Sequence, residues 1–100
     1  MLLLTKKKHQ DLIASGAKTF EIRCGSRYRN VHAGSELSIN GRFRVVVESV
    51  EVVPREAVCA AVDHQISQED LDLCYPQSDG PYFVFRFSPP QAGVPRSVAP

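Results

Sequence analysis

The sequence has few cysteines, and none of them form the closely spaced pairs that bind zinc in many proteins. Its three cysteines, Cys24, Cys59 and Cys74, lie 35 and 15 residues apart rather than in C-x-x-C pairs. An odd number of cysteines also argues against the disulfide framework of a small secreted domain. We therefore expect no metal ion or other cofactor, and a reducing, cytoplasmic setting.

Long hydrophobic runs are also missing. No apolar stretch approaches the about 20 residues that a membrane-spanning helix needs. The short run at residues 2–4 is too brief for the core of a signal peptide, and its lysines follow it rather than precede it. We expect no membrane partner, and nothing in the sequence fixes the oligomeric state.

The chain has no strong net charge, but its charges are unevenly divided. Its 12 basic and 11 acidic residues give a net charge of +1, which argues against a generic binder of polyanions. Residues 1–50 hold nine basic and four acidic side chains, giving +5, whereas residues 51–100 hold three and seven, giving −4. If the first half forms one surface, that surface is basic and favours an anionic ligand. An ordinary solvated charge distribution is the alternative.

The residues that are present indicate one folded domain. With 100 residues, 43% hydrophobic and 23% charged, the composition is that of an ordinary globular protein. We expect a domain over residues 1–88 and a flexible, proline-rich tail over residues 89–100.

Hydrophobic periodicity predicts an α+β fold with five strands and three helices. Thr5 is the predicted cap of the first helix and Ser67 of the last, and Asn40-Gly41 is a strong hairpin signal. The strands are predicted over 2–4, 18–23, 35–40, 42–52 and 82–87, and the helices over 6–15, 55–63 and 67–74. Five short strands around one core favour a small, mostly antiparallel β-barrel with flanking short helices, although periodicity does not separate a closed barrel from an open sheet.

One run of residues resembles a known family. Gly16-Ala17-Lys18-Thr19-Phe20-Glu21-Ile22-Arg23 is similar to the Gly-x-Lys-Thr-x-Glu-x-Arg run of ASCH domains, members of the PUA-like superfamily. A second family element, a Gly-Asp-x-Leu/Ile strand start, has its counterpart at residues 33–39, with Ser35 where aspartate is usual. The aromatic strand at 82–87 also fits, so the resemblance covers roughly residues 1–88.

This resemblance implies a PUA-like barrel with a cleft beside the motif strand and a role connected with RNA. One small bacterial branch of the family hydrolyses N4-acetylcytidine with a lysine, a threonine three residues later and a glutamate in the helical segment before the last strand. Carried over, the lysine is Lys18, the threonine position holds Glu21, and the nearest helical carboxylate is Asp63, with Glu69 behind it.

The residue types themselves allow amide hydrolysis. Lys18 is suited to stabilise an oxyanion or, if desolvated, to act as a base, and a carboxylate from Glu21 or Asp63 is suited to activate water. No Ser-His-Asp or Cys-His spacing is visible. Alternation places Thr19, Glu21 and Arg23 on a polar outer face of their strand, where Glu21 and Arg23 either form a simple salt bridge or contact a base edge and a phosphate.

Aromatic and basic residues elsewhere are candidates for ligand contacts. Arg27, Tyr28 and Arg29 fall in a glycine-bounded loop and suit stacking and phosphate binding, or else form an ordinary polar loop. In the last strand the phenylalanines read as core residues, and Tyr82, at the strand entrance, is the aromatic residue that we expect at a cleft.

The preferred prediction is an RNA- or modified-nucleoside-binding domain with a basic cleft. The first alternative is an N4-acetylcytidine amidohydrolase that uses Lys18 and a carboxylate. The second is a protein-interaction module that uses the acidic residues Glu69, Asp70 and Asp72. The predicted partner is RNA or a modified nucleoside.

Overall fold

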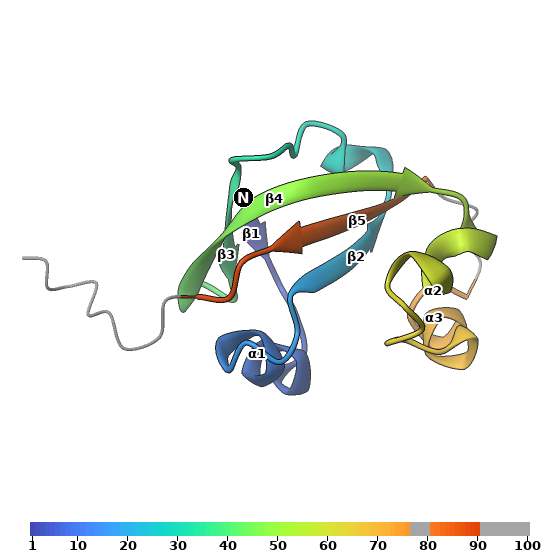
Figure 1. The fold of residues 1–100 in the computed structure, drawn as a ribbon, viewed down its shortest axis with the longest axis horizontal. Helices are drawn as coiled ribbons and strands as arrows, with labels where there is room; N and C mark the ends of the chain where they lie inside the picture. Colours follow the sequence, from blue (N-terminus) through green and yellow to red (C-terminus); the bar gives the residue numbers. More distant parts are fainter. Residues whose placement is uncertain (77–80, 91–100) are drawn as a thin grey trace, which may run out of the picture.

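The computed structural model describes residues 1–76 and 81–90, so most of the predicted tail lies outside the described residues. Within these ranges the chain is an α+β protein, as predicted (Figure 1). The elements in order are β1 (Leu2–Leu3), α1 (Lys7–Ala14), β2 (Phe20–Cys24), the 3-10 turn η1 (Ser26–Tyr28), β3 (Glu36–Ile39), β4 (Phe43–Val53), η2 (Arg55–Ala57), α2 (Val58–Ala61), α3 (Gln68–Cys74) and β5 (Tyr82–Phe87).

The five strands form one mixed sheet in the order β1-β3-β4-β5-β2. β1 pairs with β3 in parallel, and the other three ladders are antiparallel. The expectation of a barrel was wrong, because the two outer strands, β1 and β2, do not pair and the sheet stays open. Closure requires the outer strands to join along their length, and β1 has just two residues.

The strand β5, which lies between β4 and β2, has a hydrophobic core on each side. Phe83, Phe85 and Phe87 pack in one cluster, which confirms their predicted core role. Tyr82 and Val84 face a second cluster that includes α2 and α3 residues. Burial on both faces explains why five of the six β5 residues are buried.

The structure confirms the predicted hairpin turn and the predicted cap of α3, but not the predicted cap of α1. Asn40 and Gly41 both have positive φ, 55° and 72°, as the predicted hairpin turn requires. Ser67 caps α3 by accepting a hydrogen bond from the Asp70 N–H at 3.0 Å, as predicted. Thr5 does not cap α1: its N–H donates to Asn40 Oδ1 at 2.8 Å, and Lys6 stands at the cap position without a side-chain bond.

α1 and α3 both lie below the sheet in Figure 1, α1 to the left of β2 and α3 to the right of it. The predicted helix over residues 55–63 is divided into η2 and α2, and it ends in a left-handed turn in which Asp63 has a φ of 54°. None of the helices in the described ranges has the length and apolar character needed to cross a bilayer.

Candidate functional site

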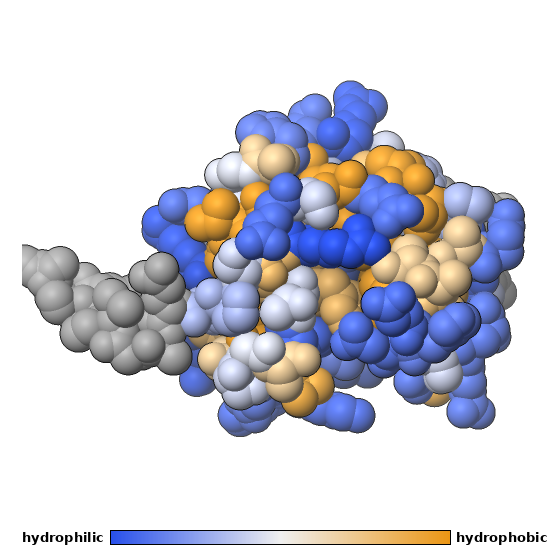
Figure 2. All heavy atoms as spheres, in the orientation of Figure 1, coloured by the Kyte–Doolittle hydropathy of each residue, from blue (hydrophilic) through white to orange (hydrophobic). Residues whose placement is uncertain are grey.

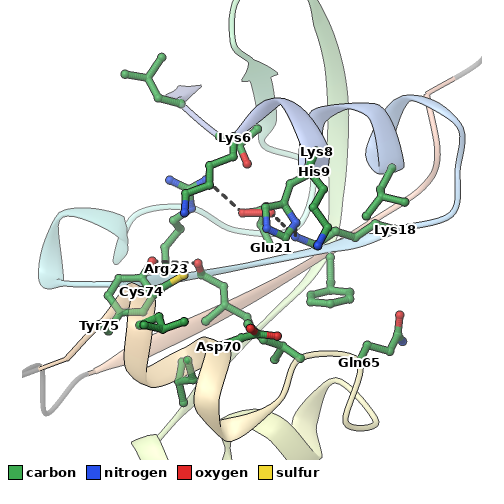
Figure 3. A pocket seen from close by; sticks show the side chains of 18 of the residues that line it. Lys6, Lys8, His9, Lys18, Glu21, Arg23, Gln65, Asp70, Cys74 and Tyr75 are labelled. Atoms are coloured by element: carbon green, nitrogen blue, oxygen red, sulfur yellow. Dashed lines mark hydrogen bonds and ion pairs between the residues drawn. The ribbon is translucent and has the colours of Figure 1, made fainter.

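A cleft of about 690 Å³ lies along β2, between α1 and α3. This volume is in the range of small-molecule sites. β2 is an outer strand of the sheet and pairs with β5 along one edge. Its other edge, which has no neighbouring strand, faces the cleft. The lining residues come from the segment after β1, from α1 and the turn after it, from β2, and from α3 with the residues on either side of it. Figure 3 labels ten of them.

At the floor of the cleft a buried carboxylate joins two cations. Glu21 is 5% exposed, and its two oxygens accept hydrogen bonds from Lys18 Nζ at 2.7 Å and Arg23 Nη2 at 3.0 Å (Figure 3). The Lys18 and Arg23 side chains are 13% and 15% exposed. The prediction of a solvated outer face for Glu21 was therefore wrong, because the edge of β2 forms the floor of a cleft between two helices.

His9 extends this group on the α1 side. Its Nδ1 lies 3.2 Å from Lys18 Nζ, and since an ammonium group has no lone pair, Nδ1 accepts the hydrogen bond. Burial, followed by the positive charge of Lys18, lowers the pKa of His9 below 6.5. The imidazole is therefore neutral at neutral pH and, because Nδ1 accepts from Lys18, carries its proton on Nε2.

Tyr75 and Arg23 close the other end of the floor. The Tyr75 hydroxyl donates to the main-chain oxygen of Ile22 at 3.1 Å, which satisfies a carbonyl on the outer edge of β2. Burial raises the pKa of Tyr75 to about 12, so the phenol stays neutral. Burial opposes the charge of Arg23, but Glu21 outweighs it and the pKa of Arg23 is raised.

The cleft combines positive charge with an apolar rim. Its lining holds four cations and two carboxylates, which gives +2 with His9 neutral: Lys6, Lys8, Lys18 and Arg23 against Glu21 and Asp70. Three leucines at the rim are unusually exposed: Leu4 at 71%, Leu12 at 38% and Leu73 at 76%. Such a site suits a ligand with a flat apolar body and an anionic or carbonyl-bearing edge. Elsewhere, Figure 2 shows hydrophobic residues at the surface in the region of β4.

The helical carboxylates differ from those expected. Asp63 is exposed in the turn after α2, and neither it nor Glu69 lines the cleft. The α3 carboxylate that does line it is Asp70. The catalytic role predicted for Asp63 therefore has no support from its position, which is in the left-handed turn at 63–64 and outside the cleft lining.

The remaining predicted residues lie outside the cleft. Tyr28 is 8% exposed and its ring packs 6.0 Å from the Phe85 ring, centroid to centroid. Arg27 and Arg29 are exposed, with the Arg27 guanidinium 5.1 Å from the Tyr28 ring centroid. Tyr82 is fully buried and its hydroxyl accepts a hydrogen bond from Arg55. Both tyrosine rings are thus core residues and offer no stacking surface.

The contribution of α1 to the cleft was not predicted from the sequence. His9, Leu12 and Lys8 all line the cleft, and their spacing of three and four residues places them on one helix face. That spacing is visible in the sequence and could have predicted a shared helix face. Asp70 and Tyr75 had no comparable signal, because their position depends on how α3 turns back toward β2. In the described part of the chain no three His, Cys, Asp or Glu side chains are grouped to hold a metal ion.

Protonation of His9 is expected to destabilise the fold at acidic pH. Between its lowered folded pKa and 6.5, the unfolded chain binds more protons than the folded chain. The contribution of His9 to the free energy of unfolding is therefore fully present above pH 6.5 and declines as the pH falls below it. Urea unfolding across this window measures the effect, and His9→Asn is expected to flatten it. An unchanged pH dependence in His9→Asn would contradict the assignment.

Comparison with known proteins shows a shared fold. No protein-family model matches the chain, and no curated protein sequence matches it. Among solved structures, hypothetical protein PH0355 superposes with a TM-score of 0.72 and 15% identity, over 88% of this chain and 96% of that one. Protein PF0455 from Pyrococcus furiosus superposes with a TM-score of 0.65 and 14% identity, over 91% and 96%. The chain is therefore similar in fold, over nearly its whole length, to these two proteins.

Proposed function

We propose that this chain is an RNA- or modified-nucleoside-binding domain of the ASCH type, and that the ligand occupies the cleft along β2. The observation that carries the proposal is the buried Glu21, held between Lys18 and Arg23 at the floor of a cleft of ligand size. These are the lysine, glutamate and arginine of the run that resembles the ASCH motif. Apolar residues of similar volume often stabilise a fold as well as a buried ion pair does, so stability alone is a weak explanation for these charged residues at the floor of a cleft.

The floor suits the polar edge of a nucleobase. Glu21 fixes the two cations, and their other N–H groups are donors for carbonyl or phosphate oxygens. A lysine already held by a carboxylate loses less side-chain entropy on binding than a free lysine, which favours binding of a ligand. The apolar side chains of the rim suit the two faces of a base.

Binding of single-stranded RNA tests this function. We expect a short labelled RNA of mixed sequence to bind, and Lys18→Gln to weaken binding by about tenfold to hundredfold, since hydrogen bonds to charged groups contribute about 1.5–3 kcal/mol. Affinity should also fall as salt rises, because phosphate contacts release counterions. Fluorescence anisotropy measures both effects.

Lys7→Gln is the matched control for the RNA experiment. Lys7 belongs to α1 but lies outside the cleft lining, and its exposed amine pairs with Asp11 at 3.1 Å. It should bind RNA nearly as the wild type does, with circular dichroism confirming that both variants are folded. Equal affinities for Lys18→Gln and wild type would overturn the proposed site.

The contacts of Lys18 favour a second candidate function, hydrolysis of N4-acetylcytidine. Its amine touches both a carboxylate, Glu21, and a neutral imidazole, His9. In this reaction water adds to the acetyl carbonyl, the bond from that carbon to N4 breaks, and cytidine and acetate leave. Lys18 would stabilise the oxyanion, while the Glu21 carboxylate would take the proton of the water and return it to the departing nitrogen.

Cytidine release separates the two candidates. Purified protein is incubated with N4-acetylcytidine, and the products are separated by chromatography beside a Lys18→Ala control. Release that depends on Lys18 would make the chain a hydrolase. No release by folded protein would eliminate this candidate and leave binding as its role.

A further inference from the structure

We infer that Lys6 and Lys8 form a phosphate subsite on the α1 side of the cleft, so that the preferred ligand is a phosphorylated nucleotide rather than a free nucleoside. This inference rests on the proposed function and specifies the class of ligand. It concerns a different part of the cleft from the Lys18–Glu21–Arg23 floor, because both lysines belong to the start of α1 (Figure 3).

Three consecutive lysines at the start of α1 have different surroundings. Lys6 and Lys8 line the cleft, whereas Lys7, between them, does not. Lys7 forms an ion pair with Asp11. Within residues 1–76 and 81–90, neither Lys6 nor Lys8 has an acidic group within salt-bridge distance. The two cations without an acidic partner are thus the two that face the ligand space.

Positive charge exceeds negative charge on the α1 side of the cleft. At the floor, Glu21 already offsets one of its two cations, and Asp70 belongs to the opposite wall, on α3. The first turn of α1 holds no acidic residue. Lysines at the positive end of a helix dipole are unfavourable. A bound anion would offset this cost.

The chemistry of the site favours phosphate. Lysine binds phosphate as a compact charge with three donors, and a phosphate monoester offers several acceptor oxygens that two neighbouring lysines can share. A cleft of about 690 Å³ has room for a base at the floor and a phosphate beside α1. The phosphate can belong to a free nucleotide or to an RNA chain, and both present the same group to the lysines.

Calorimetry with matched ligands tests the subsite. The probes are the four nucleosides, their 5′- and 3′-monophosphates and a short single-stranded RNA. The proteins are the wild type, the double variant Lys6→Gln/Lys8→Gln and the control Lys7→Gln. We expect phosphorylated probes to bind the wild type about tenfold or more tightly than the nucleosides, as two charge-assisted contacts would give. This preference should disappear in the double variant and persist in Lys7→Gln.

The outcomes separate the subsite from the proposed function. If nucleosides bind as tightly as monophosphates, or the double variant keeps the preference, the subsite is overturned while the binding function stands. If the RNA binds, the monophosphates do not, and RNA affinity falls in the double variant alone, the phosphate is that of an RNA chain and the subsite is supported. If no probe binds the folded wild type, the proposed function fails and the subsite with it.

Discussion

Glu21→Gln is expected to lower the free energy of unfolding by about 3 kcal/mol, because removing one partner of a buried ion pair leaves the other charge uncompensated. Here two cations lose their partner at once, since Lys18 and Arg23 both contact Glu21 and both are mostly buried. Glutamine keeps the size of the side chain, so the loss reports charge rather than packing. Urea unfolding followed by circular dichroism gives the value.

An exposed glutamate provides the control for Glu21. Glu36 pairs with Arg44 at 3.2 Å, and these side chains are 59% and 70% exposed. Exposed pairs contribute about 0–1 kcal/mol, so Glu36→Gln should lose no more than that. If Glu21→Gln and Glu36→Gln lose the same free energy, the buried Lys18–Glu21–Arg23 group does not have the strength that its geometry implies.

Leu71→Ala is expected to cost about 3 kcal/mol of stability, as truncation of a buried leucine typically costs about 2–5 kcal/mol. Leu71 is fully buried in the second core cluster and fixes α3 against the sheet. α3 also forms one wall of the cleft, so ligand affinity should fall with stability. Chemical unfolding measures the first effect and RNA titration the second.

Leu73, two residues further along α3, separates the two effects. It is 76% exposed at the cleft rim, so Leu73→Ala should change stability by less than about 0.5 kcal/mol. If the rim covers a base, the same substitution should weaken binding by about fivefold, the cost of about 1 kcal/mol of lost apolar burial. Full affinity in Leu73→Ala would show that the ligand does not use the α3 wall.

Much of the fold could be predicted because its signals are local. The alternation in Tyr82–Phe87 gave the last strand and its phenylalanine face, Asn40-Gly41 gave the hairpin turn, and Ser67 gave the start of α3. Each of these signals depends on residues within a few positions of one another. The open sheet could not be predicted in this way, because closure depends on whether β1 and β2, which are distant in sequence, pair.

The site was predictable where it lies on one strand and not where helices complete it. Lys18, Glu21 and Arg23 were chosen from the motif strand, and they meet at the cleft floor. The burial of Glu21 was not foreseen, since it results from α1 and α3 flanking the edge of β2. The same dependence on long-range packing explains why Asp63 was chosen when Asp70 lines the cleft.

We propose that RNA or a nucleoside binds in the cleft along β2. Amide chemical-shift mapping by NMR, with the full chain and a short single-stranded RNA, tests it most directly. We predict that the largest shifts fall on the two helices and the strand that line the cleft, including His9, Lys18 and Glu21. Shifts confined to the exposed loop around Arg27 and Arg29, with the cleft residues unmoved, would contradict the claim.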